Sequence, residues 1–118
     1  MKESLLYEKS MNFAIRCVKF YKYLREEKNE YVLSKQLLRS GTSVGANIRE
    51  SRFAQSTADF DSKLNIALKE AEETQYWIEL LFRSEIITES EYKSIYSDSG
   101  ELIALLLSTL KTFRNNNK

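Results

Sequence analysis

The sequence predicts an all-α fold, an antiparallel up-down-up-down bundle of four helices that forms a single domain over residues 1–118. Proline is absent and glycine occurs only three times, so the residues that most often interrupt helices are nearly missing. Hydrophobic residues make up 42% of the chain, which is enough for one core. Apolar residues recur every three or four positions in four segments, and short connections between such segments favour antiparallel neighbours.

The first predicted helix covers residues 4–27. Its apolar residues are separated by steps of three or four, or by sums of these steps, so they share one helical face. They are Leu6, Phe13, Cys17, Tyr21 and Leu24.

The second predicted helix covers residues 30–54, with Asn29 as its N-cap. Its interior holds Gly41 and Gly45, each of which would destabilise an exposed helix by roughly 1 kcal/mol relative to alanine. Because the apolar face continues in phase across them, we expect an intact helix whose glycines mark the close approach of another helix backbone. A loop break at Gly41 is the alternative. The residues on the apolar face are Leu33, Leu37, Val44 and Ile48.

The third predicted helix, residues 57–84, has the most regular apolar period in the chain. Ser56 or Thr57 can cap its N-terminus. It is expected to stop near Ser84, because the start signals of another helix follow. The apolar residues that define it are Phe60, Leu64, Ala67, Ala71, Ile78 and Leu81.

The fourth predicted helix covers residues 89–113. Thr88 and Glu91 have the spacing of a capping box, in which each side chain bonds to the backbone N–H of the other residue. Residues 97–100 are its weakest stretch, where a kink is predicted. The polar residues 115–118 are expected to fray.

The chain carries more apolar surface than one stripe per helix requires. Five apolar residues of the fourth helix point in nearly every direction, and the first helix has extra aromatics, so a second buried surface and a homo-oligomer are predicted. A wide internal core is the alternative. The residues concerned are Leu102, Ile103, Leu105, Leu106, Leu107, Phe20, Tyr21 and Tyr23.

Charge is unevenly distributed along the chain, although the net charge is only +1. Residues 1–54 hold 11 Lys or Arg against 6 Asp or Glu, whereas residues 55–100 hold 4 against 10. The basic residues can contact nucleic-acid phosphates, or they can pair with the acidic third helix of the same chain or of a second copy. The candidates for nucleic-acid binding are Arg16, Lys19, Lys22, Arg39, Arg49 and Arg52.

The residue types that most catalytic sites require are missing. Histidine is absent, which removes the commonest general base and metal ligand. The single Cys17 lies on an apolar face, where a buried thiol is expected. Glu50, Glu70 and Glu73 could suggest a two-metal bundle site, but such sites need Glu-x-x-His pairs. The sequence therefore predicts no enzyme, no catalytic residue, no metal and no cofactor.

The sequence predicts a cytoplasmic protein with no membrane partner. One cysteine cannot form an internal disulfide, and no segment has the pattern of a signal peptide. The longest apolar run, residues 102–107, is far shorter than the roughly 20 residues that cross a bilayer.

Two stretches carry a resemblance to a known family. Gln36–Ser51 reads QLLRSGTSVGANIRES, and Asp59–Thr74 reads DFDSKLNIALKEAEET, followed by Tyr76 and Trp77. In this order and spacing they resemble the signatures of the bacterial four-helix-bundle proteins encoded in 23S rRNA intervening sequences. Ser51 departs from the family pattern, which has alanine or glycine there.

The resemblance implies that this chain forms a ring-shaped homo-oligomer, with five subunits expected. A related branch, the accessory variability proteins of diversity-generating retroelements, is similar in fold and binds nucleic acid through a basic surface; that branch is usually more basic than this chain, whose sequence pI is about 7.8. The polar marks that the resemblance implies are Arg39, Ser40, Ser43, Asn47 and Glu50 on the second helix and Glu73 on the third.

A physical hypothesis for these marks is that Asn47 and Glu73 pair across the second and third helices and fix their register. The signature would then be mainly structural. Two functions follow for the whole protein: a non-enzymatic, ribosome-associated oligomer that binds RNA or a nucleic-acid-handling protein through basic residues, or a protein-interaction scaffold with no nucleic-acid affinity.

Overall fold

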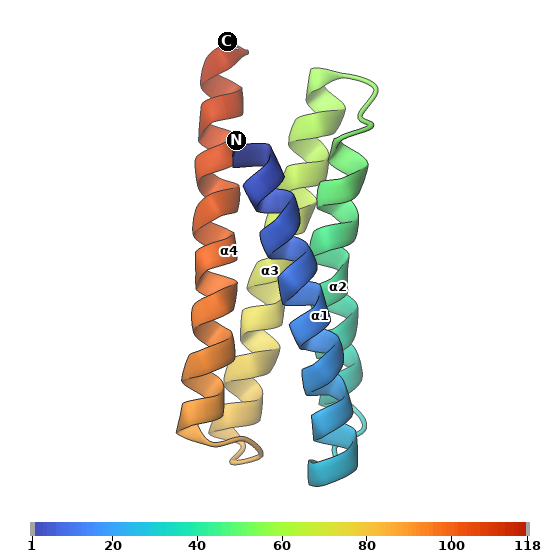
Figure 1. The fold of residues 1–118 in the computed structure, drawn as a ribbon, viewed down its shortest axis with the longest axis vertical. Coiled ribbons are helices and arrows are strands. Elements are labelled where there is room, and N and C mark those ends of the chain that lie inside the picture. Colours follow the sequence, from blue (N-terminus) through green and yellow to red (C-terminus); the bar gives the residue numbers. More distant parts are fainter. Residues whose placement is uncertain (1, 118) are drawn as a thin grey trace.

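The computed structural model describes residues 2–117, with side chains from Ser4 onward. Four helices follow one another and run in alternating directions (Figure 1). The prediction of an all-α chain with four helices is confirmed. The helices are α1 (Lys2–Lys28), α2 (Leu33–Ser51), α3 (Thr57–Arg83) and α4 (Glu89–Asn116).

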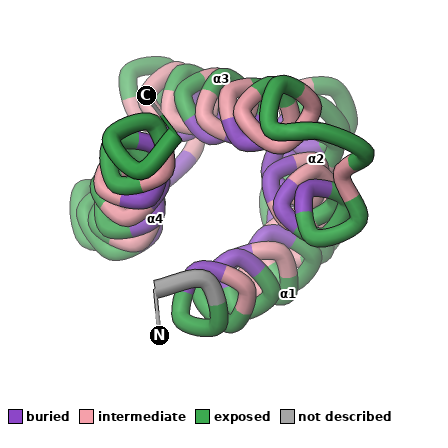
Figure 2. The backbone as a smooth tube through the Cα atoms, turned by 90° about the horizontal axis from the view of Figure 1, so that it is seen from above, coloured by how far each residue is buried: buried purple, intermediate pink, exposed green. Residues whose placement is uncertain are grey.

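The helices surround one core, as the view along the bundle shows (Figure 2). Each helix packs on two neighbours, and the seam between α1 and α4 is the most loosely packed of the four. The molecule is elongated, 48 × 22 × 20 Å, as expected for long helices lying side by side. The largest fully buried apolar side chains are Leu24, Leu37, Val44, Leu64, Ile78, Leu81, Ile95, Leu102 and Leu106.

The connection between α1 and α2 differs from the prediction that Asn29 caps the second helix. Asn29 has a φ of 52°, the left-handed conformation that ends a helix and that asparagine tolerates better than most residues. The carboxylate of Glu30 instead accepts hydrogen bonds from the backbone N–H groups of Leu33 (3.1 Å) and Ser34 (2.7 Å). Because Asn29 and Glu30 complete the turn, α2 begins at Leu33 rather than residue 30.

Helix α2 passes through both glycines without a break, as predicted, and the alternative of a loop at Gly41 is wrong. Their surroundings differ. A methyl group on Gly41 would collide with the Sγ of Cys17 in α1 and lie 3.1 Å from its Cβ. A methyl group on Gly45 would make ordinary contacts, 3.6 Å from the carbonyl oxygen of Ser10. Only Gly41 is therefore required by packing, and the group that requires it is a side chain rather than a backbone.

The predicted caps of α3 and α4 are confirmed. The Ser56 hydroxyl accepts a hydrogen bond from the N–H of Asp59 at 3.0 Å. In the capping box, Thr88 accepts from the N–H of Glu91 at 3.1 Å, and the Glu91 carboxylate accepts from the N–H of Thr88 at 2.8 Å. Together these caps satisfy backbone donors that an uncapped helix would leave without partners.

Helix α4 is assigned as one helix across residues 97–100 and continues to Asn116, so the prediction that residues 115 and 116 fray is wrong. Arg114 donates from Nε (2.6 Å) and NH2 (3.0 Å) to the Asp61 carboxylate of α3, which ties this end to the bundle. Lys118, the last residue of the expected frayed end, lies outside the described residues.

Much of the surplus apolar surface predicted from the sequence is taken up inside the chain. Leu102 and Leu106 are in the core, and Ile103 and Leu105 pack partly against it. Only Leu107 is half exposed, at 52%. The wide-core alternative therefore accounts for most of these residues.

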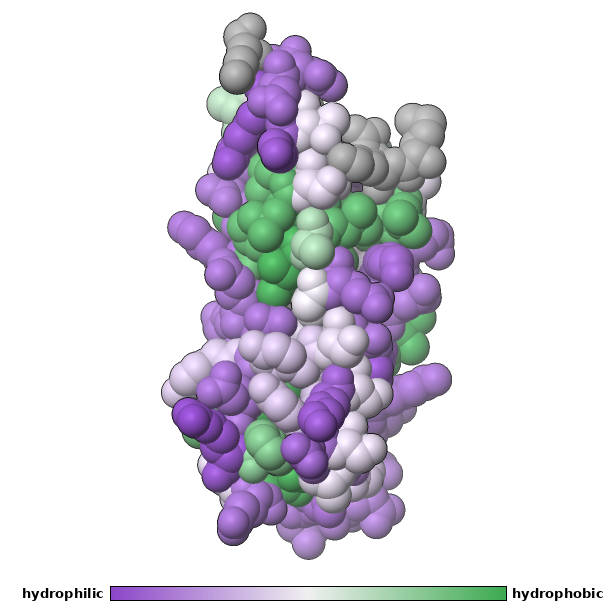
Figure 3. All heavy atoms as spheres, turned by 90° about the vertical axis from the view of Figure 1, so that its left-hand side faces the viewer, coloured by the Kyte–Doolittle hydropathy of each residue, from purple (hydrophilic) through white to green (hydrophobic). Residues whose placement is uncertain are grey.

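Other apolar side chains remain on the surface. Apolar atoms gather in one area of the face that carries α4 (Figure 3). On α1, Met11, Ile15 and Val18 are each exposed by more than a third and lie at positions i, i+4 and i+7. This α1 stripe (Met11, Ile15, Val18) is an unpartnered apolar surface that the sequence pattern did not single out.

We predict that Gly41→Ala destabilises the fold by about 1–3 kcal/mol, because the added methyl group overpacks the buried contact with Cys17. Gly45→Ala, the matched control, should be neutral or stabilise by up to about 1 kcal/mol, because it only raises helix propensity. Urea unfolding followed by circular dichroism measures both. Cys17→Ala should restore room for the methyl group, so equal effects of Gly41→Ala with and without Cys17 would contradict the prediction.

Candidate functional site

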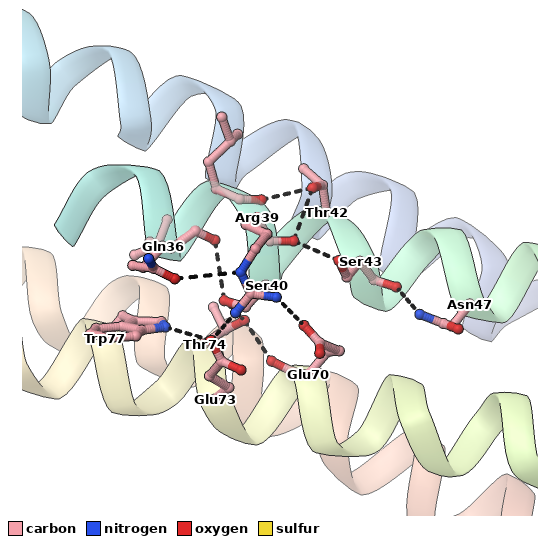
Figure 4. Close-up of polar contacts among 12 residues, drawn as sticks. Gln36, Arg39, Ser40, Thr42, Ser43, Asn47, Glu70, Glu73, Thr74 and Trp77 are labelled. Carbon is pink, nitrogen blue, oxygen red and sulfur yellow. Dashed lines mark hydrogen bonds and ion pairs between the residues drawn. The ribbon is translucent and has the colours of Figure 1, made fainter. Parts of the chain in front are cut away.

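The family-signature residues lie mainly where α2 packs on α3 (Figure 4). From α2, Arg39 donates to the Glu70 carboxylate at 3.2 Å and pairs with Glu73, both on α3. The indole N–H of Trp77 donates to the same Glu73 carboxylate at 3.0 Å. Sequence analysis marked Arg39 and Glu73 separately, and the structure brings them together.

Ser40, the neighbour of Arg39, points the other way into the core. Its hydroxyl oxygen lies 2.8 Å from that of Thr74 on α3, and both residues are fully buried. A buried hydroxyl without a partner would cost about 1–3 kcal/mol. These two hydroxyls bond to each other, and each also lies near a carbonyl oxygen of its own helix, Glu70 for Thr74 (2.8 Å) and Leu37 for Ser40 (3.4 Å). Sequence analysis gave Thr74 no role, although it is the polar position within the otherwise apolar period of α3.

Ser43 and Asn47 do not reach from α2 to α3, contrary to the hypothesis for Asn47. Asn47 donates from Nδ2 to the carbonyl oxygen of Ser43 at 2.9 Å, and Ser43 bonds to the carbonyl of Arg39 at 2.7 Å. The proposed Asn47–Glu73 pair is therefore wrong, because Asn47 bonds along its own helix and Glu73 bonds to Arg39 and Trp77 (Figure 4). Glu50 is exposed and pairs with Lys63 of α3 at 3.0 Å.

These contacts define an α2–α3 polar network, which has a buried part and a surface part. Its charged members are partly exposed, so each ion pair contributes little on its own, whereas the buried hydroxyl pair fixes how the two helices face each other. Three of the signature residues, Arg39, Ser40 and Glu73, thus take part in the contact between α2 and α3. The network consists of Arg39, Ser40, Glu70, Glu73, Thr74 and Trp77.

Two of the six candidate nucleic-acid-binding residues, Arg16 and Arg39, form ion pairs within the chain. Arg39 belongs to the α2–α3 polar network. Arg16 pairs with Asp98 of α4 and donates to the Ser94 hydroxyl at 2.6 Å, so its partner is α4 rather than the acidic third helix. Both guanidinium groups hold helices together, and their charge is compensated locally.

The other four candidates form no ion pair with any side chain from Ser4 to Asn117. Lys19 and Lys22 are exposed on α1. Arg49 and Arg52 lie at the end of α2, where Arg49 donates to the Tyr7 hydroxyl at 2.7 Å. The six candidates do not form one surface. Arg49 lies beside Tyr7 near the start of α1, whereas Lys22 is fifteen residues further along the same helix, about 22 Å at the rise of an α-helix.

Arg49 and Arg52 come together on one aromatic ring, in the Tyr7 cluster (Tyr7, Arg49, Arg52). The guanidinium carbons of Arg49 and Arg52 lie 5.6 and 4.8 Å from the centre of the Tyr7 ring, a cation–π arrangement. The ring orients both cations without cancelling their charge. Phe53, the next residue in the chain, is 81% exposed. Sequence analysis named both arginines but missed Tyr7, which is 42 residues away from Arg49 in the chain.

The side chains considered above for catalysis or metal binding include Cys17, which is buried, and Glu70 and Glu73, which form ion pairs. Burial raises the pKa of the Cys17 thiol to about 12, so a reactive thiolate does not form near neutral pH. Glu70 and Glu73, considered as metal ligands, are occupied by Arg39. Within residues 4–117, acidic and sulfur side chains form no group of three or more that could hold a metal ion.

None of the four helices, within the described residues, is long and apolar enough to cross a membrane.

The fold and the α2–α3 polar network together define a small helical-bundle protein in which Arg39 and Ser40 of α2 bond to side chains of α3. The chain belongs to the 23S rRNA-intervening sequence protein family, whose sequence pattern matches residues 2–108. The family resemblance found in the sequence is thereby confirmed.

A crystal structure supports the same assignment. It is a protein of unknown function from the S23 ribosomal protein family of Bacteroides thetaiotaomicron, 58% identical to this chain, with a TM-score of 0.93. The similarity covers 94% of this chain and 99% of the other. A comparison with curated proteins gives no match.

We predict that Thr74→Val destabilises the fold by about 1–2 kcal/mol, because it leaves the buried Ser40 hydroxyl without its partner across the helices. The double variant Ser40→Ala with Thr74→Val should lose less than the sum of the two single variants, because both buried polar groups are then removed. Urea unfolding of all four proteins measures this coupling. Strictly additive losses would contradict it.

Proposed function

We propose that this chain is a non-enzymatic RNA-binding protein whose contact surface is the Tyr7 cluster together with Phe53. The observation that carries the proposal is the pair Arg49 and Arg52, held on one aromatic ring with no carboxylate partner among residues 4–117. The absence of histidine and the burial of Cys17 support a binding role rather than a catalytic one. The family name associates such chains with ribosomal RNA.

The surface matches the chemistry of single-stranded RNA. Guanidinium groups bind phosphate oxygens, and an exposed aromatic ring offers a face on which an unstacked base can stack. Arg49 and Arg52 supply the first, and Phe53 supplies the second. Lys63 lines the same shallow groove as Arg49 and Phe53, although Glu50 and Asp59 line it too and restrict where a phosphate can lie. A few nucleotides is the length that this surface can contact.

We predict that Arg49→Gln and Arg52→Gln each weaken binding of a labelled single-stranded oligoribonucleotide about tenfold at low salt. The affinity falls as salt rises, and each variant should make the slope of log affinity against log salt shallower by about 1, because one phosphate contact is lost. Phe53→Ala should cost about 1–3 kcal/mol of binding and leave that slope unchanged, because stacking releases no counterions. Fluorescence anisotropy over a series of salt concentrations measures both quantities.

Arg83→Gln is the matched control, because Arg83 is an exposed arginine at the opposite end of α3 and pairs only with Glu79 among the described side chains. An equal loss of affinity in this control would show that only overall charge matters. A wild-type protein that does not bind RNA at low salt would refute the proposal.

The second candidate function is a self-assembling scaffold, and the α1 stripe favours it. Met11, Ile15 and Val18 form an apolar line that no described side chain covers, as the surface of an obligate oligomer does. Lys19 and Lys22 lie one helical turn beyond Ile15 and Val18, so they can reach acidic side chains on a neighbouring copy. The ring of five subunits implied by the family resemblance is the assembly that we propose.

We predict that Ile15→Glu reduces the molar mass of the assembly to that of the 13.8 kDa monomer, because it places a charge in the centre of the apolar interface. Light scattering at low and high salt measures the change. Val32→Glu is the control, because Val32 is also exposed but lies in the turn before α2. A wild-type monomer, or an Ile15→Glu variant that still assembles, would contradict this prediction.

A further inference from the structure

One end of the bundle is hollow. A cavity of about 540 Å³ lies where the start of α1, the α2–α3 turn and the end of α4 come together. This is the end that carries both chain termini in Figure 1 and that faces the viewer in Figure 2. All four helices contribute apolar side chains to its wall, so the cavity is a continuation of the core that the side chains of residues 4–117 do not fill. These side chains are Leu6, Ile48, Phe60, Leu64 and Phe113.

The floor of this end cavity is formed mainly by apolar side chains. Leu6, Ile48 and Leu64 are each at most 2% exposed. The buried hydroxyls of Ser51 and Thr109 also line it, but they are bonded to the backbone carbonyls of Ile48 (2.6 Å) and Leu105 (2.8 Å) of their own helices. Because both hydroxyl groups already donate to backbone carbonyls, they have no proton to donate to a ligand. The floor therefore favours a hydrocarbon chain of a ligand over a polar group.

The mouth of the end cavity has the opposite character. Arg52 is the only charged residue that lines the cavity among the described residues, and no carboxylate lines it there. The other polar residues at the mouth, Gln55, Ser56 and Thr57, are neutral. The N-terminal end of α3 already has the Asp59 carboxylate, which accepts from the Gln55 N–H at 3.1 Å outside the cavity lining, so Arg52 is the group that favours an anion. Electrostatics at the mouth thus select an anion, and the apolar floor selects a hydrocarbon.

We propose that the end cavity binds an amphipathic anion of the medium-chain carboxylate class, with its hydrocarbon chain on the floor and its carboxylate at Arg52. The volume lies within the range of about 300–1,000 Å³ that small-molecule sites occupy. Tyr7 holds the Arg52 guanidinium at 4.8 Å without neutralising it, so the cation stays available to a carboxylate. A cationic amphiphile of equal chain length meets Arg52 as a like charge and binds more weakly.

The test is calorimetric titration of the full chain with decanoate, decanol and decyltrimethylammonium, each below its micelle concentration. Decanoate should bind with one molecule per chain and at least tenfold more tightly than decyltrimethylammonium. Arg52→Gln should reduce decanoate affinity about tenfold, to the level of decanol, because it removes the charge-assisted hydrogen bonds. Arg83→Gln should leave the affinity unchanged.

A second pair of variants tests the location without altering charge. Ala54 lines the mouth of the end cavity, so the bulky indole of Ala54→Trp should obstruct the mouth and abolish decanoate binding. Ala104→Trp, an exposed alanine on α4 outside the cavity lining, should bind decanoate as the wild type does. Circular dichroism before each titration confirms that a variant is folded.

The proposal is overturned if anion and cation bind equally, if decanoate does not bind, or if Ala54→Trp binds as well as the wild type. It is also overturned if Ala54→Trp abolishes binding of the oligoribonucleotide, because the cavity would then belong to the nucleic-acid site. RNA binding that persists in Ala54→Trp supports two separate ligands that share Arg52. Loss of RNA binding in the wild type would refute the proposed function without affecting this inference.

Discussion

The packing of α2 depends on the two adjacent residues Ser40 and Gly41, which face different neighbours. Gly41 leaves the space that the Cys17 side chain of α1 occupies, and Ser40 bonds to Thr74 of α3 inside the core. Any larger residue at position 41 would push α1 away, and any apolar residue at position 40 would leave Thr74 with one partner fewer. These two positions therefore influence how α2 packs against both α1 and α3.

The division of the arginines into structural and available groups follows from this arrangement. With α2 fixed against α3, Arg39 reaches Glu70 and Glu73, and its charge is used within the fold. Between α1 and α4, which pack on each other less closely than the other neighbouring helices, Arg16 of α1 forms an ion pair with Asp98 of α4. Exposed ion pairs of this kind add little stability, so their main effect is on where positive charge remains. Among the six candidates it remains on Arg49 and Arg52 at the end of the bundle and on Lys19 and Lys22 along α1.

That end combines two features in a small space. Arg52 belongs to the Tyr7 cluster, and the same residue lines the end cavity. A phosphate and a carboxylate are alternative partners for the same guanidinium, which binds either through paired hydrogen bonds. If both proposals hold, the two ligands compete for Arg52, and the occupancy of the cavity would modulate the contact with RNA.

The sequence by itself determined the helices, because periodicity, the Ser56 cap and the Thr88–Glu91 box are local properties of neighbouring residues. It also determined the family, through two contiguous stretches. Only the tertiary structure decided which side chains meet: Arg39 with Glu73, Ser40 with Thr74, and Tyr7 with Arg49. Those partners are 34 to 42 residues apart, and helical period gives a residue's face but neither its depth along the axis nor the rotation of the facing helix. The failed Asn47–Glu73 pair and the undetected end cavity have this same cause.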